Sequence, residues 1–151
     1  MMPLMDFPAM YRNVMLATAD AKVVRNLITR YGWRLGVGRF VAGEDFESAL
    51  PALRKIEESG RSIVLDVLGE FVGTEDEARA IADTIQGAVK AAAAAGTSAY
   101  FSVKPTQLGL GVSSELAYEL ASGLASTLHD VGGHLCLDME NLPYLDRTLD
   151  L

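Results

Sequence analysis

The sequence predicts an α/β fold in which parallel strands alternate with helices. Two observations support this prediction. Four short β-branched runs are each followed by a turn and a longer stretch, which in the first three units is amphipathic, and no short hairpin turns join one run to the next. Parallel pairing with right-handed crossovers is therefore expected. Periodicity leaves two architectures open, an open doubly wound sheet or part of a closed barrel.

The first two units have clear boundaries. A strand is predicted over 39–42, and Glu44 and Asp45 suit the start of the helix that follows, because acidic groups stabilise a helix N-terminus. A second strand is predicted over 62–68, followed by a helix from Thr74 through the alanine run 91–95. Its start resembles a capping box with Glu77, and Gly96 ends it.

The last two units follow the same theme. A third strand is predicted over 99–104, then a helix over 114–129 and a fourth strand over 134–139. Residues 1–38 are expected to be an N-terminal helical segment, and 39–151 to be the α/β domain.

Composition narrows the class of protein. Half of the 151 residues are hydrophobic, enough for a real core. The formal charge of -7 with scattered basic residues argues against nucleic acid as a partner. The first 18 residues contain no basic leader and no membrane-length apolar run, and the single cysteine, Cys136, has no internal disulfide partner. A cytoplasmic location is expected.

Charged residues follow three of the apolar strands. Glu70, Lys104 and Asp138 stand at strand ends, and Glu140 comes two residues after Asp138. Carboxyl ends of parallel strands form the rim of an active site in α/β folds, whereas the simpler interpretation is that such charges are solvated. Three together favour function. Asp66, inside an apolar strand, is expected to be paired and to brace the site.

Alternation places His134, Cys136, Asp138 and Glu140 on one face of the fourth strand. All are ligand types, but side chains along one strand point in parallel rather than converge, so no metal site is predicted. His134 and Cys136 are interpreted as a lower interior layer beneath the carboxylates. The segment 109–114, GLGVSS, suits a phosphate cradle or a turn; a turn without ligand is the prediction.

Four strings at four successive strand ends, RFVAGE, LDVLGE, SVKPTQLGL and LDMENLPYLDRTLDL, resemble the proline dehydrogenase family in its compact monofunctional bacterial form. The resemblance covers the N-terminal half of such an enzyme. It implies a (β/α)8 TIM barrel holding FAD, an oxidoreductase of proline catabolism that converts L-proline to Δ1-pyrroline-5-carboxylate and passes electrons to a quinone. Peripheral membrane association of the complete enzyme is implied as well.

The resemblance also implies roles for individual residues. Lys104 would bind the proline carboxylate, Asp138 would be the active-site aspartate that tunes the Lys104 charge, and Met139 would touch the flavin. Glu70 would form a gating ion pair with an arginine that has no counterpart here. Pro105 departs from the family's usual leucine or isoleucine and removes a backbone donor next to Lys104.

A full barrel takes about 250 residues and eight strands, so the chain is expected to be truncated, to lack most of the FAD-binding residues and to be inactive alone. Unpaired strand edges would favour self-association into a homo-oligomer. Two alternatives stay open: a non-catalytic self-associating module, and a small α/β enzyme that acts on a phosphorylated metabolite with Lys104 and Asp138 as acid and base.

Overall fold

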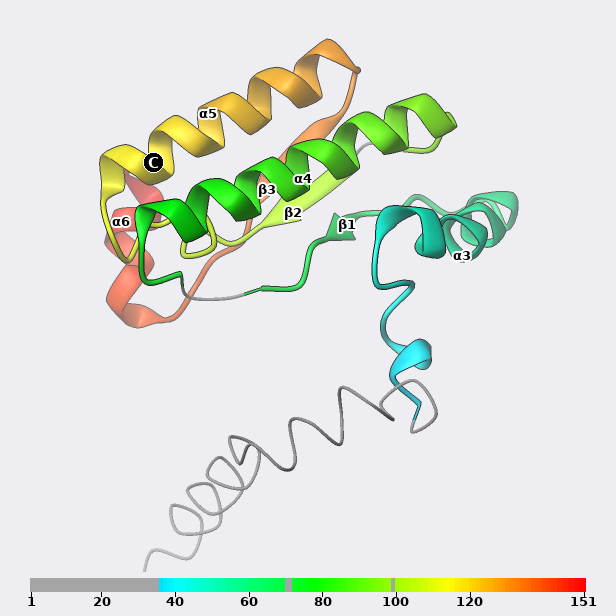
Figure 1. Cartoon of the computed structure of the whole chain (residues 1–151), viewed down its shortest axis with the longest axis horizontal. Helices are drawn as coiled ribbons and strands as arrows, with labels where there is room; N and C mark the ends of the chain where they lie inside the picture. Colours follow the sequence, from blue (N-terminus) through cyan, green and yellow to red (C-terminus); the bar gives the residue numbers. More distant parts are fainter. Residues whose placement is uncertain (1–35, 70–71, 99) are drawn as a thin grey trace, which may run out of the picture. The chain divides into compact units, whose positions relative to one another are not determined.

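The computed structural model describes residues 36–69, 72–98 and 100–151 (Figure 1). The chain divides into two units, 1–44 and 45–151. The predicted N-terminal helical segment, 1–38, lies almost entirely outside the described residues. In the described part of the first unit, Val37–Arg39 forms a single 3₁₀ turn, η1. The second unit carries the sheet.

The second unit alternates helices and parallel strands, as predicted. Its strands are β1 (Leu65–Asp66), β2 (Tyr100–Val103) and β3 (His134–Leu137), paired in the order β1-β2-β3. Its helices are α3 (Phe46–Glu58), α4 (Glu75–Ala95), α5 (Ser114–Asp130) and the short α6 (Leu145–Leu149), with a 3₁₀ turn η2 (Leu142–Tyr144) before α6.

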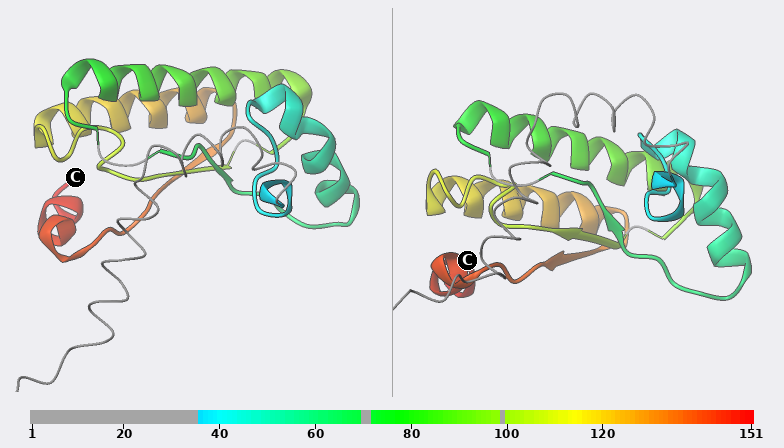
Figure 2. Two further views of the ribbon diagram at one scale, coloured as in Figure 1. Left: turned by 60° about the horizontal axis from the view of Figure 1, so that its bottom comes forward. Right: turned by 90° about the horizontal axis from the view of Figure 1, so that it is seen from below.

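The two crossover helices, α4 and α5, lie side by side and cover the same face of the sheet (Figure 2). Strands in sequential order with helices on one face are the arrangement of a barrel wall, whereas a doubly wound sheet reverses its strand order and places helices on both faces. The core fills the space between helices and sheet; its largest members are Ile85, Val89, Phe101, Val103, Leu108, Leu124 and Leu128. The other face of the described sheet carries no helix.

Local signals set the helix boundaries where the sequence predicted them. In the capping box that begins α4, the Thr74 hydroxyl accepts from the Glu77 amide and the Glu77 carboxylate accepts from the Thr74 amide. Asp45 caps α3 in the same way, together with Ser48. Gly96 ends α4 in the left-handed conformation, with φ +68°.

The prediction of a strand over 39–42 is wrong. The amides of Arg39, Phe40 and Val41 donate to carbonyl groups three or four residues earlier. A strand needs its amides for a neighbouring strand, so these local hydrogen bonds produce a turn instead. The second strand exists but is shorter than the predicted 62–68, since only Leu65 and Asp66 pair with β2.

Candidate functional site

Strand alternation separates the core residues from a polar face. Phe101 and Val103 of β2 point into the core beneath the helices, so Ser102 and the residue after the strand, Lys104, project from the helix-free face. On β3, Leu135 and Leu137 pack against the core, and Asp138 follows Leu137 with its amide donating to the Val103 carbonyl at 2.9 Å. The ends of β2 and β3 thus present side chains next to each other.

Lys104 and Asp138 meet at this rim, as the sequence predicted. The Lys104 ammonium lies 3.1 Å from Oδ2 of Asp138 and 4.0 Å from Oδ2 of Asp66. The Ser102 hydroxyl donates to Oδ1 of Asp138 at 2.5 Å. These four side chains all lie at or next to the carboxyl ends of their strands. Among the three charged side chains, that of Lys104 is the most enclosed, with 27% exposed. Asp66 is paired, as expected.

These contacts hold the pKa of the Asp138 carboxyl below its ordinary value. The hydrogen bond from Ser102 is the largest cause; partial burial opposes it, and the hydrogen bond and charge of Lys104 lower the pKa further. Asp138 is therefore a carboxylate at neutral pH. Its negative charge balances the Lys104 ammonium and keeps that ammonium at the rim.

A glutamine connects the ends of β1 and β2. Oε1 of Gln107 accepts from the Lys104 backbone amide at 2.8 Å, and Nε2 donates to the Val67 carbonyl at 2.7 Å. The side-chain amide thereby takes the place of a backbone rung between the two strands, directly after their last pair, Asp66 and Ser102. Because the Gln107 side chain replaces a backbone hydrogen bond at this point, β1 stops short of its predicted end.

Pro105 fits the loop that begins at Lys104. It is the second residue of a turn in which the Gln107 amide donates to the Lys104 carbonyl at 2.9 Å, the position at which proline is favoured. Its own carbonyl accepts from the Leu108 and Leu110 amides. The donor that proline lacks is not needed in this turn.

Glu140 holds the same loop from the other side. Its carboxylate accepts from the backbone amide of Thr106 and from the Thr106 hydroxyl, both at 2.7 Å. The Glu140 carboxylate is therefore engaged by the loop after β2. Thr106 and Gln107 are each 1% exposed. The sequence analysis assigned no role to Thr106 or Gln107. Their position as polar residues within an otherwise apolar run after Lys104 was a signal of buried hydrogen bonding.

The remaining predicted site residues have different outcomes. Glu70 lies outside the described residues. Met139, beside Asp138, is 54% exposed. His134 and Cys136 share the helix-free face with Asp138, as predicted, but both are exposed rather than an enclosed layer, and the His134 ring packs edge-on against Tyr100 at 4.7 Å. Nowhere in the described ranges do three potential metal ligands of the His, Cys, Asp and Glu types gather.

The GLGVSS segment forms a turn, as predicted. The amides of Gly109, Leu110, Val112 and Ser113 all donate to carbonyl groups within 105–109. The Ser113 side chain caps α5 by accepting from the Leu116 amide. These four amides are engaged within the turn, so the turn itself accounts for the glycines of the segment.

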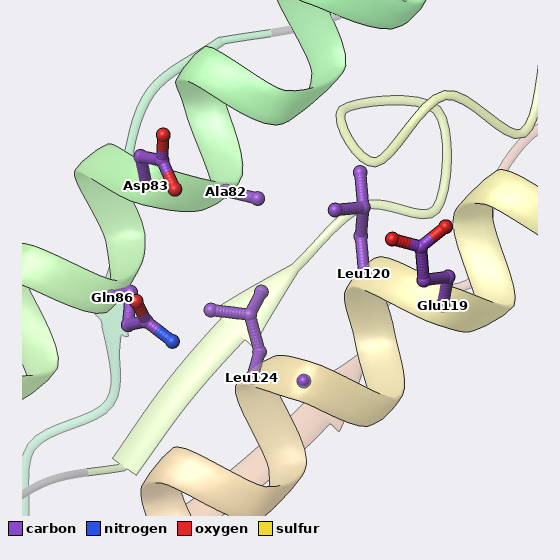
Figure 3. A pocket seen from close by; sticks show the side chains of 7 residues that line it. Ala82, Asp83, Gln86, Glu119, Leu120 and Leu124 are labelled. Carbon is purple, nitrogen blue, oxygen red and sulfur yellow. The ribbon is translucent and has the colours of Figure 1, made fainter.

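A hollow of about 260 Å³ lies between α4 and α5, on the helical side of the sheet (Figure 3). Leu120, Leu124 and Ala82 provide apolar walls, and the carboxylates at its edge are those of Asp83 and Glu119. Glu119 is already paired with Arg79 at 2.8 Å. The hollow is separated by the sheet from Lys104 and lacks a cation, so the rim at Lys104 is the better candidate site.

The rim presents one ammonium between two carboxylates, those of Asp138 and Asp66, on an open face. An ammonium is held in place by a carboxylate that stays ionised, at the carboxyl ends of adjacent parallel strands and on an open face. A carboxylate ligand can approach Lys104 without displacing a helix.

The helices that the structure describes include none with the length and apolar character of a membrane span.

Comparison with known proteins gives one consistent result. The chain is 32% identical over 142 residues to proline dehydrogenase 1 of Bacillus subtilis, covering 94% of this chain and 47% of that protein. It is 35% identical over 144 residues to the proline dehydrogenase of Deinococcus radiodurans, covering 93% and 46%. The chain spans about half the length of the curated relatives it matches. No family model matches the sequence.

The fold comparison agrees. Proline utilization A (PutA) from Bdellovibrio bacteriovorus, in a crystal structure of the protein inactivated by N-propargylglycine, superposes with a TM-score of 0.65 and 21% sequence identity. The match covers 73% of this chain and 14% of that one. It supports the α/β arrangement of parallel strands and helices described above.

Proposed function

We propose that this chain, a homologue of proline dehydrogenases over about half of their length, forms the part of a proline-oxidising flavoenzyme that binds the carboxylate of L-proline. The observation that carries the proposal is the Lys104–Asp138 pair, 3.1 Å apart at the carboxyl ends of β2 and β3. Both residues lie in the motifs that resemble this family.

In this proposal, the Lys104 ammonium forms an ion pair with the proline carboxylate. Asp138 stays ionised because Ser102 and Lys104 stabilise its charge, so it holds the ammonium in one place before substrate arrives. A fixed ammonium orients the pyrrolidine ring against the helix-free face. Asp138 is the residue to which we assign catalytic importance, and Glu70, in LDVLGE, keeps its proposed gating role.

The residues around the rim fit one part of FAD. The flavin ring is flat and largely apolar, and Leu68 and Met139, which follow Asp66 and Asp138 closely in the sequence, are exposed apolar side chains at 73% and 54%. When bound, the flavin would accept a hydride from the proline ring, and a quinone would receive the electrons. The described rim residues provide no cradle for the pyrophosphate, because this proposal assigns the Lys104 ammonium to the proline carboxylate.

We therefore expect L-proline to bind to the isolated polypeptide without being oxidised. Binding is followed by NMR chemical-shift changes at the Lys104 and Asp138 side chains during titration with L-proline. The matched controls are pyrrolidine, which lacks the carboxylate, and the Lys104→Met variant, which keeps chain length and removes charge. Saturation by L-proline that is lost with either control supports the proposal; equal responses to L-proline and pyrrolidine refute it.

Flavin is tested separately on the same protein. FAD is added, and the visible flavin absorbance is recorded before and after L-proline with a dye acceptor. Little retained flavin and no bleaching by proline are expected. Proline-dependent bleaching would contradict the expected inactivity of the chain alone while supporting the assignment to this reaction.

Self-association is a second candidate role, favoured by one observation. Among the described strands, β1 and β3 each pair on one side only, and Val64 and Leu68 beside β1 are 62% and 73% exposed. Size-exclusion chromatography with light scattering tests it. A concentration-dependent dimer that dissociates in a Leu68→Lys variant supports association through the exposed residues beside β1. A monomer at all concentrations contradicts this role.

A further inference from the structure

Two charged residues make the proposed carboxylate-binding site, but a neutral residue beneath them determines how the loop is held. Gln107 is 1% exposed and satisfies both ends of its side-chain amide, one on the Lys104 amide and one on the Val67 carbonyl. A buried amide with both ends hydrogen-bonded is costly to disturb, because removal leaves two backbone groups unpaired.

The placement of this amide is specific. β1 and β2 pair in register up to Asp66 and Ser102 and then separate. A glutamine side chain carries the same C=O and N–H as a peptide group, so Gln107 continues the ladder across the gap. The chain after β1 runs directly over it: a Cβ at Gly69 would lie 3.6 Å from Nε2 of Gln107.

The other side of the loop is held by different contacts. The Asp138 amide donates to the Val103 carbonyl, and Glu140 binds Thr106. These contacts tie the loop to the segment after β3. Gln107 is the side chain that ties the Lys104 peptide itself to β1.

We infer that Gln107 is the positioning residue for Lys104, because its buried amide fixes the Lys104 backbone between β1 and β3 and so determines where the ammonium lies. The functional meaning of this inference rests on the proposed function, in which Lys104 binds a carboxylate. The structural part, that the Lys104 side chain depends on Gln107, is testable without substrate or flavin.

The test measures the pKa of the Asp138 carboxyl by carbon-13 NMR titration of the whole chain. Four proteins are compared: wild type, Gln107→Met, Lys104→Met and the double variant. Methionine matches glutamine in length and removes both hydrogen bonds. In Gln107→Met the Lys104 contribution is lost and the Asp138 pKa rises toward its ordinary value, as far as it does in Lys104→Met, while the Ser102 contribution remains.

The double variant distinguishes positioning from general loosening. If Gln107 acts through Lys104, adding Gln107→Met to Lys104→Met leaves the Asp138 pKa where Lys104→Met alone puts it. An equal further rise in the double variant overturns the inference. So does a Gln107→Met protein that is folded and keeps the wild-type pKa at Asp138.

Two internal controls accompany the measurement. Gln86→Met removes a comparable bridging glutamine, whose Nε2 donates to the Thr127 hydroxyl at 2.9 Å between α4 and α5, and it should leave the Asp138 pKa unchanged. The Glu119 carboxyl, whose pKa is lowered by the hydrogen bond from Arg79, reports whether the fold is intact. Its low value should persist in every variant.

A measurement on the wild type covers the case in which Gln107→Met fails to fold. The Lys104 amide should exchange with solvent as slowly as the amides of β2, since its partner is a buried side chain. Exchange at the rate of a solvent-exposed amide refutes the inference. If Asp138 responds as expected but L-proline does not bind, the proposed function fails and the positioning role stands.

Discussion

The Ser102 hydroxyl donates to Oδ1 of Asp138, and this hydrogen bond is the largest single cause of the low Asp138 pKa, ahead of the Lys104 hydrogen bond and of the Lys104 charge, each taken alone. The serine lies within β2 and its hydroxyl donates directly to Oδ1, while Lys104 is partly exposed and acts on Oδ2. We predict that Ser102→Ala raises the Asp138 pKa toward its ordinary value, while the Lys104 contribution remains. Carbon-13 NMR titration of the Asp138 carboxyl measures this shift, and an Asp138 pKa that is unchanged in Ser102→Ala would contradict the prediction.

The depressed pKa of Asp138 also makes stability depend on pH. A carboxyl whose folded pKa lies below its unfolded pKa stabilises the fold at pH values above the unfolded pKa, and this contribution disappears as the pH falls through the folded pKa. We expect the urea midpoint of wild type to exceed that of Asp138→Asn near neutral pH, and the difference to shrink in acid. Other carboxylates with lowered pKa values, such as Glu119, titrate in both proteins and cancel. A difference that is constant with pH would exclude this linkage.

Removal of the Thr106 hydroxyl should destabilise the domain. Thr106 is 1% exposed and donates to Glu140 at 2.7 Å, so Thr106→Val leaves a carboxylate oxygen without this donor. The expected loss is about 1–3 kcal/mol of unfolding free energy, measured by urea denaturation. Thr84→Val, on the exposed side of α4, is the matched control and should change stability by less than about 0.5 kcal/mol. Equal effects of the two substitutions would argue against the Thr106–Glu140 contact.

Gly109 is required by both conformation and space. Its φ is +85°, and a Cβ there would lie 2.8 Å from Cδ2 of Leu116 and 3.1 Å from Cβ of Ala78. Gly96 also has positive φ, +68°, but its Cβ would meet open space. Gly96→Ala should cost about 1–2 kcal/mol for the backbone conformation alone. Gly109→Ala should lower the free energy of unfolding by clearly more than Gly96→Ala in the same thermal or urea unfolding assay. Similar losses in the two variants would show that Leu116 and α5 can shift away from position 109.

The surface ion pairs on the helices should matter little for stability. Arg79 contacts Glu75 and Glu119, each at 2.8 Å, but these side chains are 41–61% exposed. We expect Arg79→Met to raise the Glu119 pKa toward its ordinary value while shifting the urea midpoint less than Thr106→Val does. NMR titration and urea denaturation on the same sample separate the two effects. A midpoint shift as large as that of Thr106→Val would mean that the pair contributes to packing.

Local sequence signals predicted the helices well. Capping boxes, an alanine-rich run and a glycine stop act within a few residues, so the limits of α4 at Glu75 and Ala95 follow from the sequence alone. The meeting of Lys104 and Asp138 was also predictable, because parallel strands bring their carboxyl ends to the same edge of the sheet.

Specific hydrogen-bond partners explain what the sequence did not predict. β1 stops at Asp66 because the side chain of Gln107, 40 residues after Val67, takes the next place in the ladder. Glu140 has the right alternation for the rim, but the buried amide and hydroxyl of Thr106 bind its carboxylate. The run 39–42 has strand composition, yet its amides bond within their own turn. None of these partners can be identified from periodicity.

The loop after β2 takes its shape from groups that belong to other parts of the chain, the Val67 carbonyl on one side and the Glu140 carboxylate on the other. A peptide copied from this segment would therefore not adopt the same shape, and grafting the loop into another scaffold would require both flanking strands to travel with it. Efforts to redesign specificity at Lys104 should treat the three strand ends as a single unit of engineering.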